Sequence, residues 1–68
     1  MPKMTLKALR TNAGYTQKEV AEKLGKSNKT IGKWENGESF PNPKDIDALC
    51  DLYGVTYDHI NFLHKVPL

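Results

Sequence analysis

The sequence predicts an all-α protein folded as one compact bundle of five short helices. Apolar residues recur at three- and four-residue spacing in several successive segments, which is the period of a helix with one buried face. Most of these segments begin after a threonine, serine or asparagine, and four of them end before a glycine, as helices usually do. With 68 residues, the chain has room for one hydrophobic core.

The first helix is expected over Leu6–Ala13. Thr5 can cap its start and Gly14 can end it. We expect the residues before it, 1–4, to form a loose arm. The inward positions are predicted to be Leu6, Leu9 and Ala13.

The second helix begins at Gln17 and is expected to end at Leu24. Thr16 and Glu19 have the spacing of a capping box, and Tyr15 and Val20 that of a hydrophobic staple. These features fix the start of the helix, where free amides and a partial positive charge favour an anion such as phosphate.

The third helix follows after a turn so tight that the two helices must cross closely. Gly25 supplies the left-handed residue of the turn, and Ser27 caps a helix that runs to Asn36. Ile31 and Trp34 face the core. The sequence therefore predicts a helix-turn-helix over residues 17–36, with Lys29, Lys33 and Asn36 on the outer face of its second helix.

Two more helices are expected after a loop in which Phe40 covers the core. Asn42 and Pro43 are a preferred pair for a helix start, and this helix is predicted to end at Tyr53, before Gly54. Thr56 would cap a short fifth helix that ends at Leu63.

The charge is uneven along the chain. Residues 1–36 carry eight basic and three acidic residues, a net +5, whereas residues 37–68 carry two basic and five acidic ones, a net −3. The basic half contains the predicted helix-turn-helix, which is the distribution expected if that half faces a polyanion. Ordinary scatter of charges along a short chain is the alternative.

Other classes of protein have little support. No apolar run approaches the roughly 18 residues of a membrane span, and the N-terminus lacks the apolar core of about 7–15 residues that a signal peptide has. The single cysteine suits a reducing cytoplasm. Cys50 with His59 and His64 is a poor candidate for a catalytic or metal site, so we expect no enzyme activity, metal or cofactor.

Residues 17–37 resemble the helix-turn-helix of the Cro/C1-type (XRE-like) phage repressors. The shared features are Gln17, Ala21, Gly25, Ile31 and the closing sequence Trp-Glu-Asn-Gly. The resemblance implies a single lambda-repressor-like DNA-binding domain over residues 1–68, with its core at about 5–63 and a tail, 64–68, that contributes to dimerisation.

The resemblance also implies which residues contact DNA. Asn28, Lys29 and Lys33 match the positions that read bases, and the chemistry fits, because lysine donates to guanine and asparagine pairs with adenine. Gly32 lies among them, and close approach to DNA would account for its helix-interior cost of about 1 kcal/mol. The expected phosphate contacts are Thr16, Gln17, Lys26, Ser27, Thr30 and Asn36.

Two further expectations come from the family. The resemblance suggests an ion pair between Arg10 and Glu35 that ties the first helix to the third. It also suggests a two-fold interface near the C-terminus, although Phe62 and Val66 can instead complete the monomer core. The expected interface residues are Leu52, Tyr57, Phe62 and Val66.

The sequence thus favours a cytoplasmic, sequence-specific regulator that binds double-stranded DNA. The expected form is a small Cro/C1-like repressor that binds an inverted-repeat operator as a homodimer, with no small-molecule ligand. The alternative is a protein-binding module with the same fold, such as an antitoxin or an adaptor.

Overall fold

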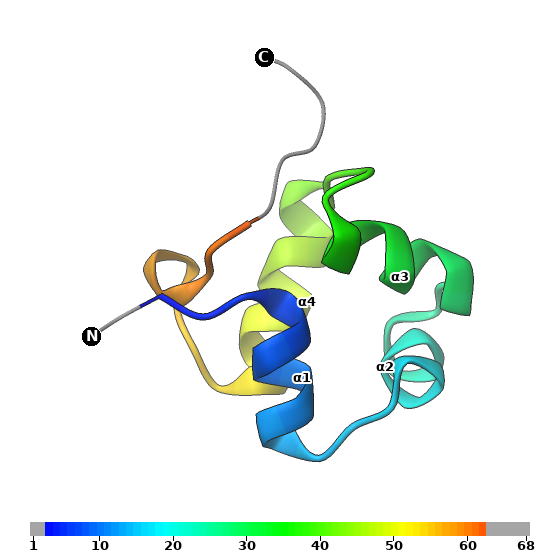
Figure 1. Ribbon diagram of the computed structural model, residues 1–68, viewed down its shortest axis with the longest axis horizontal. Helices are drawn as coiled ribbons and strands as arrows, with labels where there is room; N and C mark the ends of the chain where they lie inside the picture. The colour runs from blue at the N-terminus through cyan, green and yellow to red at the C-terminus, as the bar shows by residue number, and fades with distance from the viewer. Residues whose placement is uncertain (1–2, 63–68) are drawn as a thin grey trace.

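The computed structural model describes residues 3–62, which form four α-helices and one 3₁₀ turn (Figure 1). The elements are α1 (Leu6–Ala13), α2 (Gln17–Leu24), α3 (Asn28–Asn36), α4 (Pro43–Tyr53) and the 3₁₀ turn η1 (Tyr57–His59). All four α-helices have the bounds that the sequence predicts. None of the helices described is long and apolar enough to span a membrane.

Side chains and glycines define the helix ends. The side chain before each α-helix accepts a hydrogen bond, 2.8–3.1 Å long, from a backbone N–H three residues later. These capping residues are Thr5, Thr16, Ser27 and Asn42. Each helix ends before a glycine whose φ of 67–81° lies in the left-handed region, where a Cβ would cause strain. Local sequence alone therefore sets these bounds.

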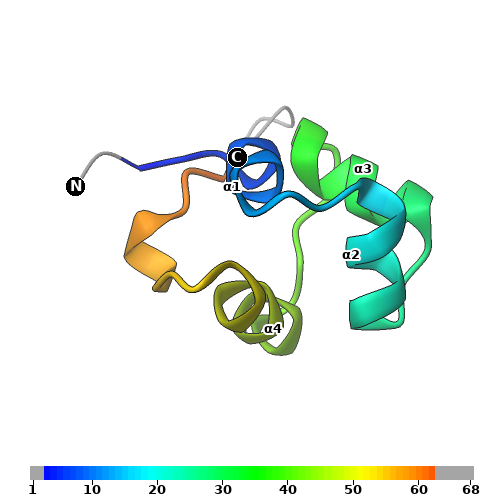
Figure 2. The same ribbon diagram turned by 90° about the horizontal axis from the view of Figure 1, so that it is seen from below.

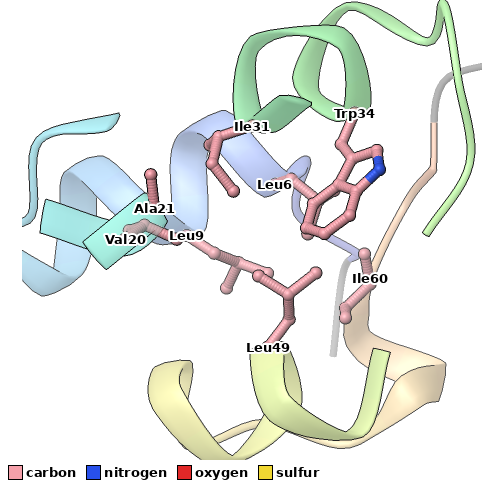
Figure 3. Close-up of a cluster of buried hydrophobic side chains, with 8 residues drawn as sticks. All are labelled: Leu6, Leu9, Val20, Ala21, Ile31, Trp34, Leu49 and Ile60. Carbon is pink, nitrogen blue, oxygen red and sulfur yellow. The ribbon is translucent and has the colours of Figure 1, made fainter. Parts of the chain in front are cut away.

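The core collects side chains from all four helices and from the segment after η1. Figure 3 shows them converging on one centre, with the Trp34 ring packed among aliphatic groups. The buried residues are Leu6, Leu9, Val20, Ala21, Ile31, Trp34, Leu49 and Ile60. Ala21 lies in α2, where a small side chain permits close approach to α3 (Figure 3).

The helix pair α2–α3 occupies one end of the molecule. In both views α2 and α3 lie beside each other, and η1 lies at the opposite end (Figures 1 and 2). The helix α3 therefore packs against α1 and α2, and η1 lies at the other end of the molecule from this helix pair.

The predicted fifth α-helix is wrong. Only Tyr57–His59 form a single 3₁₀ turn, and Ile60 is already extended, with φ −98° and ψ 125°. The cause is tertiary: Ile60 is buried in the core and pairs with Met4 in an isolated parallel β-bridge. Leu63, the predicted end of this helix, lies outside the described residues.

The same bridge corrects the expectation of a loose N-terminal arm. The Met4 N–H donates to the His59 carbonyl at 2.9 Å, and the Met4 carbonyl accepts from the Asn61 N–H at 2.9 Å. Both hydrogen bonds link the start of the chain to the segment after η1, so Met4 is fixed in the fold.

Two smaller core predictions also change. Ala13, predicted to face inward, is exposed at the end of α1. Phe40 does not cover the core: it is 46% exposed, and its ring lies 4.8 Å from that of Phe62, centre to centre. Phe62 itself is half-buried and packs against the core, so Phe40 covers Phe62 and not the core.

Candidate nucleic-acid interface

The exposed stripe of α3 consists of Lys29, Gly32, Lys33 and Asn36. Lys29, Lys33 and Asn36 are exposed, and Gly32 between them is half-buried. Their spacing of three and four residues places them on one side of the helix, and Asn28 is exposed at its first position. Ile31 and Trp34 fix the opposite side in the core. The fold thus presents two ammonium groups and two carboxamides on the part of α3 that faces solvent.

The start of α3 is fixed by two hydroxyl groups. The Ser27 Oγ accepts from the Thr30 N–H at 3.1 Å and lies 2.9 Å from the Thr30 Oγ1. Both residues were predicted to contact phosphate. Their first role is to hold the N-terminus of α3, and Ser27 remains exposed beside it.

The start of α2 is held by the predicted capping box. The Thr16 N–H donates to the Glu19 carboxylate at 2.9 Å, while the Glu19 N–H donates to the Thr16 Oγ1 at 3.1 Å. The hydrogen bond from the Thr16 N–H, together with a hydrogen bond from the Thr16 hydroxyl, lowers the pKa of the Glu19 carboxyl. Glu19 is therefore charged near neutral pH and strengthens the cap.

The buried Glu35 carboxylate joins α1, α2 and α3. Arg10 donates to it through Nε at 2.6 Å and through Nη2 at 3.3 Å, while Gln17 Nε2 donates to its Oε1 at 3.0 Å. The side chains of Arg10 and Glu35 are only 13% and 3% exposed. Arg10 also donates to the Tyr15 carbonyl, which ties the α1–α2 loop to the same cluster.

The charges of this cluster act on one another. The hydrogen bond from Arg10 to Glu35 raises the pKa of the Arg10 guanidinium, so Arg10 stays charged. Burial, and then the Glu35 charge, raise the pKa of the Tyr53 phenol to about 12. Glu35, Arg10 and Gln17 therefore form a charge-balanced cluster that links the core to the N-terminus of α2.

Two exposed groups of the predicted interface have intramolecular partners. The Lys26 ammonium lies 3.4 Å from the Asp45 carboxylate in α4. The Asn36 Nδ2 donates to the Glu38 carboxylate at 3.4 Å. Both contacts are long and at the surface, and a phosphate that approached either residue would compete with a carboxylate.

The comparison with known protein families decides what this arrangement is. Residues 6–60 match the helix-turn-helix family HTH_3, a segment that includes all four α-helices and η1. The chain belongs to this family. It is the XRE-type, or Cro/C1-type, helix-turn-helix family, as the sequence resemblance indicates. Members of this family include DNA-binding domains of transcriptional regulators.

Several curated proteins contain a similar helix-turn-helix. The activator BcrR of Enterococcus faecalis is 36% identical over 55 residues, and the regulator ImmR of Bacillus subtilis is 40% identical over 55 residues. Each match covers 81% of this chain but only 27% and 43% of the relative. The antitoxin PezA of Streptococcus pneumoniae is 35% identical over 52 residues, which cover 76% of this chain and 33% of PezA. No solved structure matches this chain significantly.

The predicted DNA-contacting residues lie in α2 and α3 or directly before them, whereas the predicted dimer residues that the structure describes lie in α4, in η1 and after η1. Tyr57 is 55% exposed in η1, and its ring centre lies 5.6 Å from that of Phe62. Leu52 is half-buried and packs against the core, as Phe62 does, so these two also complete the monomer. Val66 lies outside the described residues.

The cysteine of this domain is a small apolar group at the edge of the core. Cys50 is half-buried in α4, and burial, together with the nearby Asp47 and Asp51, raises the pKa of its thiol. A thiol of this kind is protonated at neutral pH and is a weak nucleophile. His59 Nδ1 lies 3.0 Å from the Thr56 hydroxyl, and His64 is outside the described residues.

Sequence reasoning missed three contacts of the helix-turn-helix: Gln17–Glu35, Arg10 with the Tyr15 carbonyl, and Lys26–Asp45. Each joins residues whose relative position depends on how the helices pack. Only the Gln17 contact could have been suspected from the sequence. Gln17 is a polar residue at the start of α2, and Glu35 lies near the end of the helix that packs closely against α2.

Proposed function

We propose that this domain binds specific double-stranded DNA as a homodimer and acts as a small Cro/C1-like repressor in the cytoplasm. The observation that supports the proposal best is the exposed stripe of α3, with Lys29, Lys33 and Asn36 directed away from the buried Ile31 and Trp34. In a helix-turn-helix, the second helix lies in the major groove and its N-terminal residues meet the base edges. The stripe has the charge and hydrogen-bonding groups for that position.

The proposed contacts divide into two classes. Asn28, Lys29 and Lys33 read bases, because ammonium groups donate to guanine O6 and N7 and a carboxamide pairs with adenine N6 and N7. The others contact the sugar-phosphate backbone and set the position of α3. These proposed phosphate contacts are Thr16, Gln17, Lys26, Ser27, Thr30 and Asn36.

A dimer explains how so small an interface reads enough bases. Two copies related by a two-fold axis bind an inverted repeat whose half-sites lie about one helical turn apart. The exposed Tyr57, with its neighbour Phe62, supports an interface at the end where η1 lies, away from α2. The proposed interface continues into Leu52 and into Val66 of the tail.

The test is a selection from a randomised duplex library at moderate salt, followed by sequencing of the retained DNA. We expect enrichment of an inverted repeat. Enrichment of a single half-site contradicts the dimer but keeps the DNA-binding function. Retention without enrichment that disappears on adding salt contradicts sequence-specific binding.

The second candidate function is a protein-binding module. The half-exposed aromatic cluster of Phe40, Tyr57 and Phe62, and the similarity to a domain of the antitoxin PezA, favour it. Sedimentation of the protein alone separates the two candidates. A homodimer favours the repressor, whereas a monomer that self-associates only weakly through this cluster favours a partner protein.

A further inference from the structure

Lys26 differs from the other lysines of the proposed DNA contacts, because its ammonium is already paired with a carboxylate of the same chain. Its Nζ lies 3.4 Å from the Oδ1 of Asp45, which is in the first turn of α4. Within residues 3–62, Lys29 and Lys33 have no such partner. The pair is therefore particular to the turn between α2 and α3 and is not shared by the basic stripe of α3.

The backbone is fixed at both ends of this pair. The Lys26 N–H donates to the Ala21 carbonyl at 2.9 Å. The Asp45 N–H donates to the Asn42 Oδ1 at 2.8 Å. Asp45 also lies at the N-terminus of α4, where the partial positive charge of the helix favours a carboxylate. The carboxylate on its short side chain thus stays on α4, and a change of partner requires movement of the long Lys26 side chain.

The pair lies at the surface, beside the start of α3. The Lys26 and Asp45 side chains are 34% and 14% exposed, and a surface pair of this kind adds little to stability. Lys26 directly precedes Ser27, the cap of α3, so it lies at the edge of the proposed DNA-binding face. A phosphate at this edge and the Asp45 carboxylate are both anions, so they compete for one ammonium and repel each other.

We propose that Asp45 limits the affinity for DNA by holding the Lys26 ammonium toward α4, so that a DNA phosphate has to displace a carboxylate. This inference rests on the proposed function, in which Lys26 contacts phosphate, and adds an acidic residue that opposes this contact. Asp45 is a positioning residue, since it acts through Lys26 and does not itself contact DNA. The domain therefore binds DNA more weakly than its lysines alone would allow.

The test compares Asp45→Asn with Asp47→Asn, which removes the same charge from an exposed position of α4. Fluorescence anisotropy measures binding to the duplex enriched by selection. We expect Asp45→Asn to bind about three- to fivefold more tightly than the parent, which corresponds to about 0.7–1 kcal/mol. Asp47→Asn is expected to gain less, because no lysine is paired with Asp47 and salt screens its charge. Equal affinities of the two variants overturn the proposal.

A double variant tests whether Asp45 acts through Lys26. In a Lys26→Ala background, Asp45→Asn is expected to raise the affinity no more than Asp47→Asn does, because there is no ammonium to release. A gain that persists without Lys26 overturns the proposal. Thermal unfolding without DNA is the second measurement, and the Tm of Asp45→Asn is expected to fall by less than about 8 °C. A larger fall also overturns the proposal, since the pair would then serve the fold.

The same comparison on a mixed-sequence duplex at low salt separates this proposal from the proposed function. If the parent enriches no sequence, specific regulation fails, but phosphate contacts are independent of sequence and the Asp45 comparison still gives a result. If the parent enriches an operator and Asp45→Asn binds it no more tightly than Asp47→Asn, only the Asp45 proposal fails.

Discussion

At the scale of single residues, Glu35 is the buried charge through which side chains of three helices meet. It is a charged group almost without access to water, which is costly unless it is paired and hydrogen-bonded. Arg10 and Gln17 together supply that compensation from α1 and α2. The carboxylate therefore links the packing of three helices to the orientation of the half-buried Gln17 amide.

Removing the Arg10 charge tests this dependence. Arg10→Met leaves a buried carboxylate without its cation, and we expect a loss of about 3–5 kcal/mol in the free energy of unfolding. Urea unfolding followed by circular dichroism measures it. Lys26→Ala, which removes the more exposed pair with Asp45, is the control and is expected to cost less than about 1 kcal/mol. Similar losses in the two variants would contradict the role of the buried pair.

Tyr53 gives a prediction for alkaline pH. Its pKa is about 12 in the folded protein against an ordinary value of 10.0, mainly because burial disfavours the phenolate. The folded state keeps the proton longer than the unfolded state, so the stabilisation present below pH 10 is lost as the pH rises toward 12.

Thermal unfolding over this pH range measures the effect. We expect the Tm of the parent to fall more steeply between pH 10 and 12 than that of Tyr53→Phe, which has no phenol to titrate at this position. Every other group is the same in both proteins, so its contribution cancels in the comparison. Parallel curves would show that Tyr53 is not the titrating group.

At the scale of elements, the helices are specified by their ends. The four α-helices are only 8–11 residues long, too short to be stable alone, so their caps and their packing decide where they form. The start of α2 is the most heavily fixed, with a reciprocal capping box directly before Gln17.

The capping box of α2 can be tested with a matched pair of variants. Thr16→Ala removes the hydroxyl that accepts from the Glu19 N–H and is expected to lower the free energy of unfolding by about 1 kcal/mol. Thr16→Ser keeps the acceptor, and we expect nearly parental stability. Chemical denaturation of the three proteins provides the measurement, and an equal loss in both variants would assign the effect to the threonine methyl group.

At the scale of the whole molecule, charge and apolar surface are separated. The basic residues are concentrated in the first 36 positions, which contain the helix-turn-helix, while α4 and η1 follow in the acidic half. The half-exposed aromatic cluster consists of Phe40, Tyr57 and Phe62. Tyr57 belongs to η1, which lies at the opposite end of the molecule from α2 (Figures 1 and 2). The proposed DNA face and the proposed dimer face can therefore be occupied together.

The salt dependence of DNA binding tests the basic face. We expect the logarithm of the affinity to fall linearly with the logarithm of salt concentration, by about 0.9 for each phosphate neutralised. Fluorescence anisotropy with the parent, Lys29→Ala and Lys33→Ala measures the slopes. A lysine that reads a base is expected to cost about 1–3 kcal/mol on the operator and little on mixed-sequence DNA.

A uniform loss on all sequences, with a slope shallower by about 1, would assign that lysine to a phosphate instead. Lys44→Ala, on the exposed surface of α4, is the control and should leave both quantities unchanged. If it weakens binding as much as the α3 variants, attraction is spread over the whole molecule and α3 is not the DNA-binding face.

The sequence by itself determined the four α-helices, because each has a capping side chain and a terminal glycine that act over three or four residues. It also determined the helix-turn-helix and the face on which Lys29 and Lys33 lie, since helical period separates them from Ile31 and Trp34. Tertiary structure alone decided the segment after α4. There the cap at Thr56 allows a helix, but burial of Ile60 and its pairing with Met4 require an extended chain. It likewise decided the Gln17–Glu35 contact, because hydrogen bonds between residues distant in sequence depend on how the helices pack, which no local pattern specifies.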